Sequence, residues 1–346
     1  MRRKMKAAVL YKPLDVRIED VDVPEIGPRD VLVRVRRVGI CGSDVHYYSH
    51  GRIGPFVVEK PLILGHECSG DVIEVGESVK GIKVGDRVVI EPGFTCGICE
   101  YCRSGRYNLC PNVQFYATPP FNGAFAEYVS APAGNVYRMP DGMTYEEGAM
   151  IEPLAVGLMA AKRGGISVHD SVTIFGAGPI GLLTLQAAKS HGAIETFVVD
   201  VVDYRLDYAL KLGANFVINA SREDVVKRIL KSTEDRGVDV AIEASGSPSA
   251  LQQVLDLVRP GGRIVLVGYP PTEVPIAIDK ILMKELDILG VHRYSNVFRT
   301  AIRLVSSRRV NVKALVTHVF PFERILEAFK VHIDRIGNPI KIQVEI

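Results

Sequence analysis

The amino-acid sequence predicts an α/β protein with two domains, a small β-barrel and a doubly wound parallel sheet covered by helices. Two observations support this class. Up to about residue 135, short strands are separated by glycine turns, and beyond about residue 157 short apolar strands alternate with longer amphipathic helices. The chain of 346 residues is also too long for one ordinary domain and long enough for two that each bury a core.

The first part of the chain has the alternating pattern of half-buried strands. In residues 31–36, Val31, Val33 and Val35 alternate with more polar neighbours. Similar runs occur at 62–64, 71–75 and 87–90. The glycines between and after these runs are Gly65, Gly70, Gly76, Gly81 and Gly85. Short strands with frequent turns and no repeat of fixed period favour a barrel.

The second part alternates strands with helices. The expected strands are 172–175, 196–199, 216–218, 238–244, 263–267 and 287–290. The expected helices are 179–190, 204–212, 225–233 and 248–257. Six strands in this order match a complete dinucleotide-binding fold.

The C-terminal tail returns to a mixed pattern, with helices expected near 297–307 and 323–329 and a final strand at 341–345. We expect this tail to pack back onto the first domain. The predicted division therefore joins residues 1–157 and 292–346 in the barrel domain and leaves residues 158–291 as the parallel-sheet domain.

Charge and apolar runs exclude several classes of partner. Lys and Arg total 42 against 40 Asp and Glu, so the formal net charge is +2, which gives no reason to expect nucleic acid or an acidic membrane surface as a partner. No secretory apolar core follows the basic start, and no apolar run reaches the ~18 residues of a membrane helix. The six cysteines lie between positions 41 and 110 rather than spread as disulfides would be. We expect a cytoplasmic protein with a small neutral ligand.

A glycine motif opens the first helix of the second domain. Gly176, Gly178 and Gly181 form G-x-G-x-x-G directly after a strand. The first glycine permits a tight turn, the second lets the backbone approach a pyrophosphate, and the third lets helix and strand pack closely. The helix N-terminus then faces the phosphates. The motif alone is weak evidence, but its position between strand and helix indicates a dinucleotide site.

The residue that ends the next strand indicates which dinucleotide. Asp200 lies about 20 residues beyond the glycine loop, where a carboxylate can accept hydrogen bonds from the adenosine ribose and would repel a 2′-phosphate. NAD is therefore favoured over NADP, although Arg205 could stack on adenine or meet that phosphate. Alternatively, Asp200 does not bind a ribose and is an acidic residue exposed to solvent at the end of a strand.

Four cysteines form one candidate metal site. Cys96, Cys99, Cys102 and Cys110 lie in a glycine-rich lobe at about 93–112. Four thiolates around a tetrahedral zinc leave no position for substrate, so such a site would be structural. Disulfides are the alternative, but they conflict with the tight spacing and the expected compartment.

Cys41, His66 and Glu67 form a second candidate site of a different kind. A thiolate, an imidazole and a carboxylate from separate segments are fewer than four strong ligands, so a zinc held by them keeps an open position, as catalysis needs. Taken alone, His66 would more often be an ordinary buried histidine at a strand end.

These motifs, in this order and over essentially the whole chain, resemble the zinc-containing medium-chain alcohol dehydrogenase family. The motifs are Gly39-Ile-Cys41-Gly-Ser43-Asp44-Val-His46, Gly65-His66-Glu67, the four-cysteine lobe and the glycine loop. The resemblance implies a GroES-like β-barrel catalytic domain, a Rossmann domain, NAD, and one catalytic and one structural zinc per chain. Cys68 matches none of the family's ligands and is expected to be a small buried hydrophobe.

Three residues resemble the sorbitol dehydrogenase branch of this family. Glu152 stands where many members have a second zinc cysteine, and in this branch the glutamate shares a zinc-bound water. Alternatively, Glu152 has no role at the metal and is an acidic residue that stabilises the start of a helix through the helix dipole. The pair Arg293-Tyr294 would reach substrate hydroxyls, which suits a polyol such as sorbitol or xylitol. Tyr47 and Phe115 match pocket positions, although either aromatic alone would more often be core.

The resemblance also implies roles in catalysis. Ser43 would take the substrate proton and pass it through the nicotinamide ribose to His46, while Glu152 through the zinc water is the rival route. Asp44 is a candidate partner that orients His66. Either Glu67 or Glu152 could bind zinc directly. Further candidate cofactor contacts are Ile180, Val267, Val291 and Arg293.

Other functions remain open beside polyol oxidation with NAD. Within the family, they are dehydrogenases of vicinal diols such as butanediol, of threonine or of an aldose, and some use of NADP. A nucleotide-binding protein without enzyme activity is disfavoured because every expected zinc ligand is present. We also expect a homodimer or homotetramer, formed through the exposed edge strand near 286–290.

Overall fold

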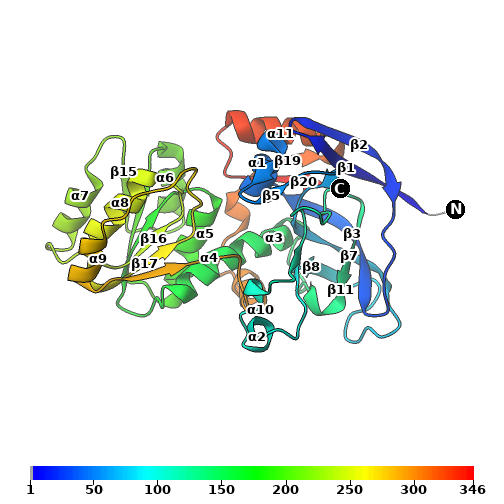
Figure 1. Ribbon diagram of the computed structural model, residues 1–346, viewed down its shortest axis with the longest axis horizontal. Coiled ribbons are helices and arrows are strands. Elements are labelled where there is room, and N and C mark those ends of the chain that lie inside the picture. Colours follow the sequence, from blue (N-terminus) through cyan, green and yellow to red (C-terminus); the bar gives the residue numbers. More distant parts are fainter. Residues whose placement is uncertain (1–2) are drawn as a thin grey trace. The chain divides into compact units, whose positions relative to one another are not determined.

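The computed structural model describes residues 3–346, which form two compact units (Figure 1). One unit contains residues up to Glu152 together with Phe298–Ser307 and Val312–Ile346. The other contains Pro153–Val297 and Arg308–Asn311. Each unit has its own sheet and its own apolar core. Among the described residues, no helix is long and apolar enough to cross a membrane.

The second unit is built on a six-stranded sheet in which every strand pair is parallel. The strands are β13 (Ser171–Phe175), β14 (Glu195–Asp200), β15 (Phe216–Asn219), β16 (Val238–Glu243), β17 (Val258–Leu266) and β18 (Asp287–Gly290). Their order is β15-β14-β13-β16-β17-β18, the doubly wound order that reverses beside the first strand. Strands β13 and β16 are buried along their whole length, as parallel strands between two helical layers must be.

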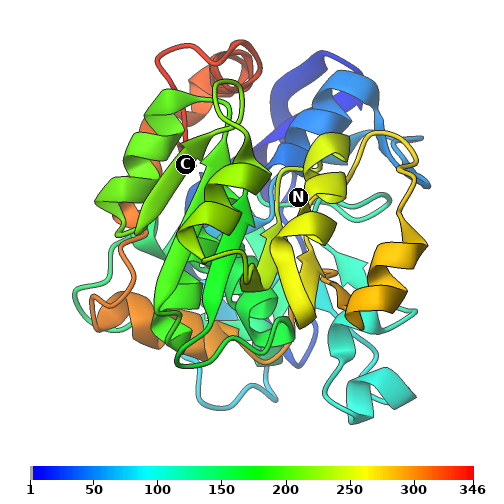
Figure 2. The ribbon, with the colours of Figure 1, turned by 90° about the vertical axis from the view of Figure 1, so that its left-hand side faces the viewer.

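Helices cover this sheet in two groups (Figure 2). The helices are α4 (Ile151–Arg163), α5 (Pro179–His191), α6 (Asp203–Lys211), α7 (Val225–Ser232), α8 (Pro248–Leu257) and α9 (Ile278–Lys284). Helices α5 and α6 contact each other and the half of the sheet that holds β14, whereas α8 contacts α7, α9 and the half that holds β17. The rings of Phe197 and Phe216 stack with centroids 4.8 Å apart in the core of this unit.

The first unit is built mainly of antiparallel strands. Its largest sheet has the order β12-β8-β7-β3-β20-β19, with β11 also paired to β3. These strands are β3 (Asp30–Gly39), β7 (Glu67–Val75), β8 (Arg87–Ile90), β11 (Tyr128–Pro132), β12 (Val136–Arg138), β19 (Val316–Pro321) and β20 (Lys341–Glu345). A second sheet has the order β2-β1-β6, from β1 (Lys4–Lys12), β2 (Asp15–Asp22) and β6 (Leu62–Ile63). Short pairs join β9 (Gly93–Phe94) to β10 (Gln114–Phe115) and β4 (Arg52–Ile53) to β5 (Phe56–Val57).

The last strand of the chain completes the sheet of the first unit. Strand β20 runs antiparallel to β3, with Gln343 opposite Gly39 and Val344 opposite Val38. Helix α11 (Ile325–Asp334) packs on β20 and places Phe329 in the core, where its ring meets that of Phe125 edge to face. The C-terminal residues therefore lie beside segments that are about 300 positions earlier in the sequence.

The structure confirms the α/β class, with a barrel-like antiparallel unit and a doubly wound parallel unit. All six expected strands of the parallel sheet are present. The helix expected at 323–329 begins instead at Ile325, after a 3₁₀ turn, and continues to Asp334. Helices α1 (Gly42–His50), α4 and α9 were not expected from the sequence.

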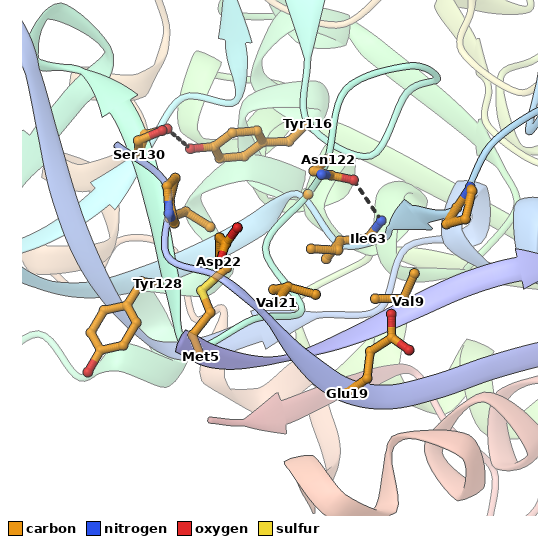
Figure 3. A pocket seen from close by; sticks show the side chains of 14 residues that line it. Met5, Val9, Glu19, Val21, Asp22, Ile63, Tyr116, Asn122, Tyr128 and Ser130 are labelled. Atoms are coloured by element: carbon orange, nitrogen blue, oxygen red, sulfur yellow. Dashed lines mark hydrogen bonds between the residues drawn. The ribbon is translucent and has the colours of Figure 1, made fainter. Parts of the chain in front are cut away.

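The first unit also contains a cavity of about 410 Å³ beneath the β1–β2 hairpin (Figure 3). Apolar side chains such as Val9, Val21 and Ile63 form much of its wall. Its two tyrosine hydroxyls are occupied, because that of Tyr116 donates to the Ser130 carbonyl and that of Tyr128 accepts from Arg3. None of the site residues expected from the sequence lines this cavity.

Candidate metal centres and nucleotide loop

Cys41, His66 and Glu67 come together in the first unit. Cys41 is the residue before α1, and Glu67 is the first residue of β7. One ligand atom of each lies within 4.8 Å of the others. His66 and Glu67 are buried, and Cys41 is partly exposed. The three donors, a thiolate, an imidazole and a carboxylate, suit zinc.

Asp44 ties together the two segments that carry these donors. Its side chain accepts hydrogen bonds from the backbone N–H of Cys41 and from that of Gly65, each at 2.9 Å. The carboxylate is completely buried. Its Oδ1 lies 3.7 Å from Nδ1 of His66, which is longer than a hydrogen bond. In this structure Asp44 therefore holds the backbone around the donors rather than the imidazole ring.

Lys341 is a functional candidate that the sequence did not reveal. Its ammonium donates to Oε1 of Glu67 at 2.5 Å and also contacts Oε2. Both side chains are at most 3% exposed. Because Oε2 makes no hydrogen bond with good geometry, that buried oxygen keeps a lone pair for a metal. The only sequence sign of this residue is one lysine at the start of the predicted final strand, β20, most of which is buried.

The charges around this cluster favour a cation. Burial alone lowers the pKa of His66, but the carboxylate of Asp44 and the thiolate of Cys41 raise it well above its usual value. Burial likewise lowers the pKa of Lys341, and the charges of Glu67, Cys41 and Glu152 raise it overall. Since both cationic forms are stabilised despite burial, the potential at the cluster is negative, and the donor set fits a divalent metal.

Helix α1 carries several expected site residues on successive turns. Ser43 is partly exposed and His46 is exposed, three positions apart and therefore neighbours on the helix surface. The ring of His50, one turn further, lies 5.7 Å from that of His46. Tyr47 points into the core and is 3% exposed. Phe115, on β10, places its ring 5.6 Å from that of His66.

The four cysteines of the lobe also converge. Their sulfur atoms all lie within 4.8 Å of one another, with 3.5 Å between Cys96 and Cys110 and 4.0 Å between Cys96 and Cys102. A tetrahedral zinc with bonds of ~2.3 Å would separate its sulfur ligands by about 3.8 Å, so the arrangement fits this ion. All six cysteines of the chain are free thiols, which excludes the disulfide alternative in this structure.

Backbone amides favour a thiolate at one position of the lobe. Hydrogen bonds from the N–H groups of Ile98 and Cys99 lower the pKa of Cys96 to about 6, whereas burial and hydrogen bonds with the other three thiols raise that of Cys99 to about 11. At the base of the lobe, the buried carboxylate of Glu91 accepts from the hydroxyls of Tyr107 at 2.7 Å and Tyr137 at 2.8 Å. Since Tyr107 lies three residues before Cys110, Glu91 anchors the lobe to the barrel.

The glycine loop in the second unit has the geometry of a phosphate-binding turn. Gly176 follows β13 with a φ of +94°, and Gly178 directly precedes α5. A Cβ on Gly181 would lie 1.7 Å from the carbonyl oxygen of Gly176, so only glycine fits there. A Cβ on Gly178 would meet nothing within 4 Å, which leaves the loop open on that side for a ligand.

Asp200 ends β14 beside this loop and braces it. Its carboxylate accepts from the backbone N–H of Ala177 at 2.7 Å, Val201 at 2.8 Å and Val202 at 3.0 Å. Arg205 lies 4.0 Å from the same carboxylate. A carboxylate can accept about four hydrogen bonds, so Asp200 has capacity left for one ribose hydroxyl.

The other expected cofactor contacts lie near the same edge of the sheet. Val267 directly follows β17 and Val291 directly follows β18, at the carboxyl ends where ligands of doubly wound sheets bind. Ile180 lies in the first turn of α5. The second unit also contains Arg293, with a φ of +56°, and Tyr294, which is 3% exposed.

Glu152 belongs to the first unit, with the Cys41 cluster. It lies in the first turn of α4 and is 6% exposed. Its charge contributes to the raised pKa of Lys341, and it also acts on Cys68, whose burial raises the pKa of the thiol to about 12. The structure therefore brings Glu152 near the cluster, although it is not one of the three donors within 4.8 Å.

Comparison with known proteins agrees with this arrangement. Residues 27–141 match the model of the alcohol dehydrogenase GroES-like domain, and residues 179–307 match that of the zinc-binding dehydrogenases. The chain is 46% identical to the sorbitol dehydrogenase of Bacillus subtilis (strain 168), over 99% of this chain and 97% of the relative.

Solved structures are similar over nearly their whole length. An Escherichia coli oxidoreductase of unknown specificity, described as involved in membrane biogenesis, matches with a TM-score of 0.96 and 41% identity, over 99% of both chains. The 2R,3R-butanediol dehydrogenase of Bacillus subtilis matches with a TM-score of 0.91 and 35% identity, also over 99% of both chains. These matches confirm the prediction of an NAD- and zinc-dependent oxidoreductase. The chain belongs to the zinc-containing medium-chain alcohol dehydrogenase family, in its sorbitol dehydrogenase branch.

Proposed function

We propose that this protein oxidises a secondary hydroxyl of a polyol, such as sorbitol or xylitol, to a ketose with NAD. The observation that carries the proposal is the cluster of Cys41, His66 and Glu67 with Glu152 buried nearby, where a cysteine would complete the ligand set of many relatives. The identity of 46% with a sorbitol dehydrogenase supports the same substrate class.

Cys41, His66 and Glu67 would hold the catalytic zinc, and Glu152 would share its water, as the family resemblance implies. The four cysteines of the lobe would hold the structural zinc. When bound, the catalytic zinc supplies a Lewis acid and NAD supplies the hydride acceptor. Because five of the six cysteines group as candidate metal ligands rather than as disulfide pairs, we expect the protein to act in the cytoplasm.

Helix α1 offers a path for the proton that leaves the substrate. Ser43, two residues after Cys41, would take the proton, and the exposed His46 would release it to water. His50, with its ring 5.7 Å from that of His46, would extend this path by one helical turn. Glu152 is the rival group for proton transfer, because it is buried beside the cluster.

The nucleotide site would use the glycine loop for the pyrophosphate and Asp200 for the adenosine ribose. Gly178 leaves space for the phosphates, and the free capacity of the Asp200 carboxylate suits a 2′-hydroxyl rather than a 2′-phosphate. Arg205 keeps some use of NADP open. Ile180, Val267, Val291 and Arg293 would contact the rest of the cofactor.

The substrate site would combine apolar walls with several hydrogen-bonding groups. Tyr47 and Phe115 would line it, and Arg293, Tyr294 and Glu152 would bind the additional hydroxyls of a polyol. A site that hydrogen-bonds a hydroxyl discriminates strongly against an analogue that lacks it. The structural likeness to a butanediol dehydrogenase keeps vicinal diols as the second candidate class, and threonine as a third.

We also propose a homo-oligomer formed through the β18 edge of the parallel sheet. Strand β18 ends the sheet, and large apolar side chains on it and on α9 are exposed, including Leu282 at 71%, Met283 at 76% and Ile288 at 37%. An exposed apolar edge strand is a template for pairing with a second copy.

A substrate panel tests the polyol assignment. The purified enzyme with NAD should oxidise sorbitol or xylitol with a higher kcat/KM than 2,3-butanediol, threonine or 2-butanol. Arg293→Leu should lower kcat/KM for the polyol by about 10- to 100-fold, because a charged hydrogen bond is lost, with a smaller effect on 2-butanol. The exposed Arg222→Leu serves as control. A preference for butanediol or threonine, or equal losses on all alcohols, would reject the assignment.

Removing one lobe cysteine tests the structural zinc. Cys99→Ser should lower the metal content from about two zinc ions per chain to about one and lower the Tm, because the closed four-sulfur site stabilises the lobe. Cys68→Ala is the matched control, since this buried thiol belongs to neither cluster. Zinc is measured by atomic emission and the Tm by calorimetry. An unchanged zinc content in Cys99→Ser would contradict the structural site.

Replacing Lys341 tests whether its ammonium competes with the catalytic zinc for Glu67. In Lys341→Met the carboxylate loses its buried partner, so the catalytic zinc should be bound about 10-fold more tightly, while the metal-free protein becomes less stable. Lys341→Arg keeps the charge and should stay near wild type. Zinc affinity is measured by competition with a chromogenic chelator. Equal affinities in all three proteins would mean that the ion pair does not influence the metal.

Charging the β18 edge tests the oligomer. Ile288→Lys should reduce the molar mass in solution to that of a single chain, because a buried lysine in the interface would lack a partner. Ile194→Lys makes the same substitution at a residue that is 63% exposed elsewhere in the same unit, and it should leave the molar mass unchanged. Light scattering gives the mass. A wild-type chain that is monomeric, or an unaffected Ile288→Lys oligomer, would exclude this interface.

A further inference from the structure

A second hollow of about 510 Å³ lies on the first unit, formed by three segments that take no part in the metal clusters. They are residues 80–82, residues 133–140 and helix α10 (Phe298–Ser306). The volume falls within the ~300–1,000 Å³ of small-molecule sites. None of the metal donors or glycine-loop residues lines this hollow.

The hollow is strongly cationic. Its lining contains Lys80, Arg138, Arg299 and Arg303 and no carboxylate. All four cations are exposed. Within residues 3–346, none of their side chains forms an ion pair or a hydrogen bond with another described residue. Four positive charges around one hollow that no carboxylate lines repel one another, so this arrangement is unfavourable without an anion.

Two of these cations repel each other on the same helix. Arg299 and Arg303 are four positions apart on α10, where like charges face each other and destabilise the helix. The opposite face of α10 is buried through Phe298, Ala301 and Val305, so packing fixes the direction in which both arginines point. An anion between the two guanidinium groups would remove the repulsion.

The floor of the hollow is rigid. The guanidinium of Arg299 lies 5.3 Å from the centre of the Tyr137 ring. The Tyr137 hydroxyl donates to the buried Glu91 at 2.8 Å, which fixes the ring. Ile82 and Ile302 supply apolar surface beside it. The arginine is therefore held on an aromatic face, which leaves its N–H groups for a ligand.

We propose that this hollow binds a small molecule that carries two phosphate groups or a diphosphate. Guanidinium forks match phosphate oxygens in two-point hydrogen bonds, and four cations balance the charge of two phosphate groups. A nucleic acid is disfavoured because the cations surround one hollow rather than form a stripe. The ligand site lies outside the residues to which we assign catalysis, so it constitutes a second binding site of this dehydrogenase.

The test titrates the zinc-loaded enzyme, saturated with NADH so that the cofactor's own phosphate site is filled. Pyrophosphate and fructose 1,6-bisphosphate are the two probes, and inorganic phosphate is the single-charge comparison, each followed by isothermal calorimetry. We expect one site per chain for at least one of the two probes, with affinity that falls as salt rises. The tighter probe tells a diphosphate ligand from a bisphosphate.

Variants locate the site. Arg299→Gln with Arg303→Gln should weaken binding of the tighter probe about tenfold or more, because two charge-assisted contacts are lost. Arg138 is left unchanged, because it also lines a neighbouring hollow with Asp86 and Asp141. Arg309→Gln with Lys330→Gln removes the same charge from exposed positions outside the hollow and should bind as wild type. The Tm and zinc content of each protein show that it is folded and metal-loaded.

Three results would overturn the proposal. The first is that neither probe binds. The second is that inorganic phosphate binds as tightly as both probes. The third is that the two double variants weaken binding of the tighter probe equally. Because the titration does not depend on turnover, each can be told apart from a wrong assignment of the alcohol substrate.

Discussion

The buried contact between Lys341 and Glu67 is the interaction on which the catalytic end of the first unit depends. It joins residues 274 positions apart, and it exists only because strand β20 pairs with β3. A carboxylate that is 1% exposed would be very unfavourable without a compensating charge. The return of the C-terminal segment therefore both closes the sheet and makes it possible to bury a metal-ligand candidate.

One ammonium does not balance the acids around it. Glu67, Glu152 and the thiolate form of Cys41 act on this single lysine. Asp44 and Cys41 act on His66, whose raised pKa reports the negative potential. A divalent cation supplies the missing positive charge, as it would for the four sulfur atoms of the lobe. The two candidate centres thus share one electrostatic principle. They differ in ligand number, and only the cluster with three donors leaves room for a substrate.

The parts of the fold that the sequence predicted are those set by local spacing. The strand and helix alternation, the glycine turn and the four-cysteine lobe each depend on residues within about 20 positions of one another. Lys341 could not be predicted, because its partner is fixed by pairing between the two ends of the first unit. The bridging role of Asp44 escaped for a similar reason. Its second partner is the N–H of Gly65, and a backbone donor leaves no trace in side-chain patterns.

Residues of the nucleotide loop can be required by packing as well as by a bound cofactor. Gly181 is required whether or not a cofactor is bound, because any side chain would collide with the carbonyl of Gly176. Asp200 likewise stabilises the loop through Ala177 N–H before it meets any ribose. Replacement of Asp200 would therefore disturb the phosphate turn as well as the choice between NAD and NADP. Gly178 has no such packing cause, because a Cβ there would meet nothing within 4 Å, so a bound phosphate would explain a glycine at this position.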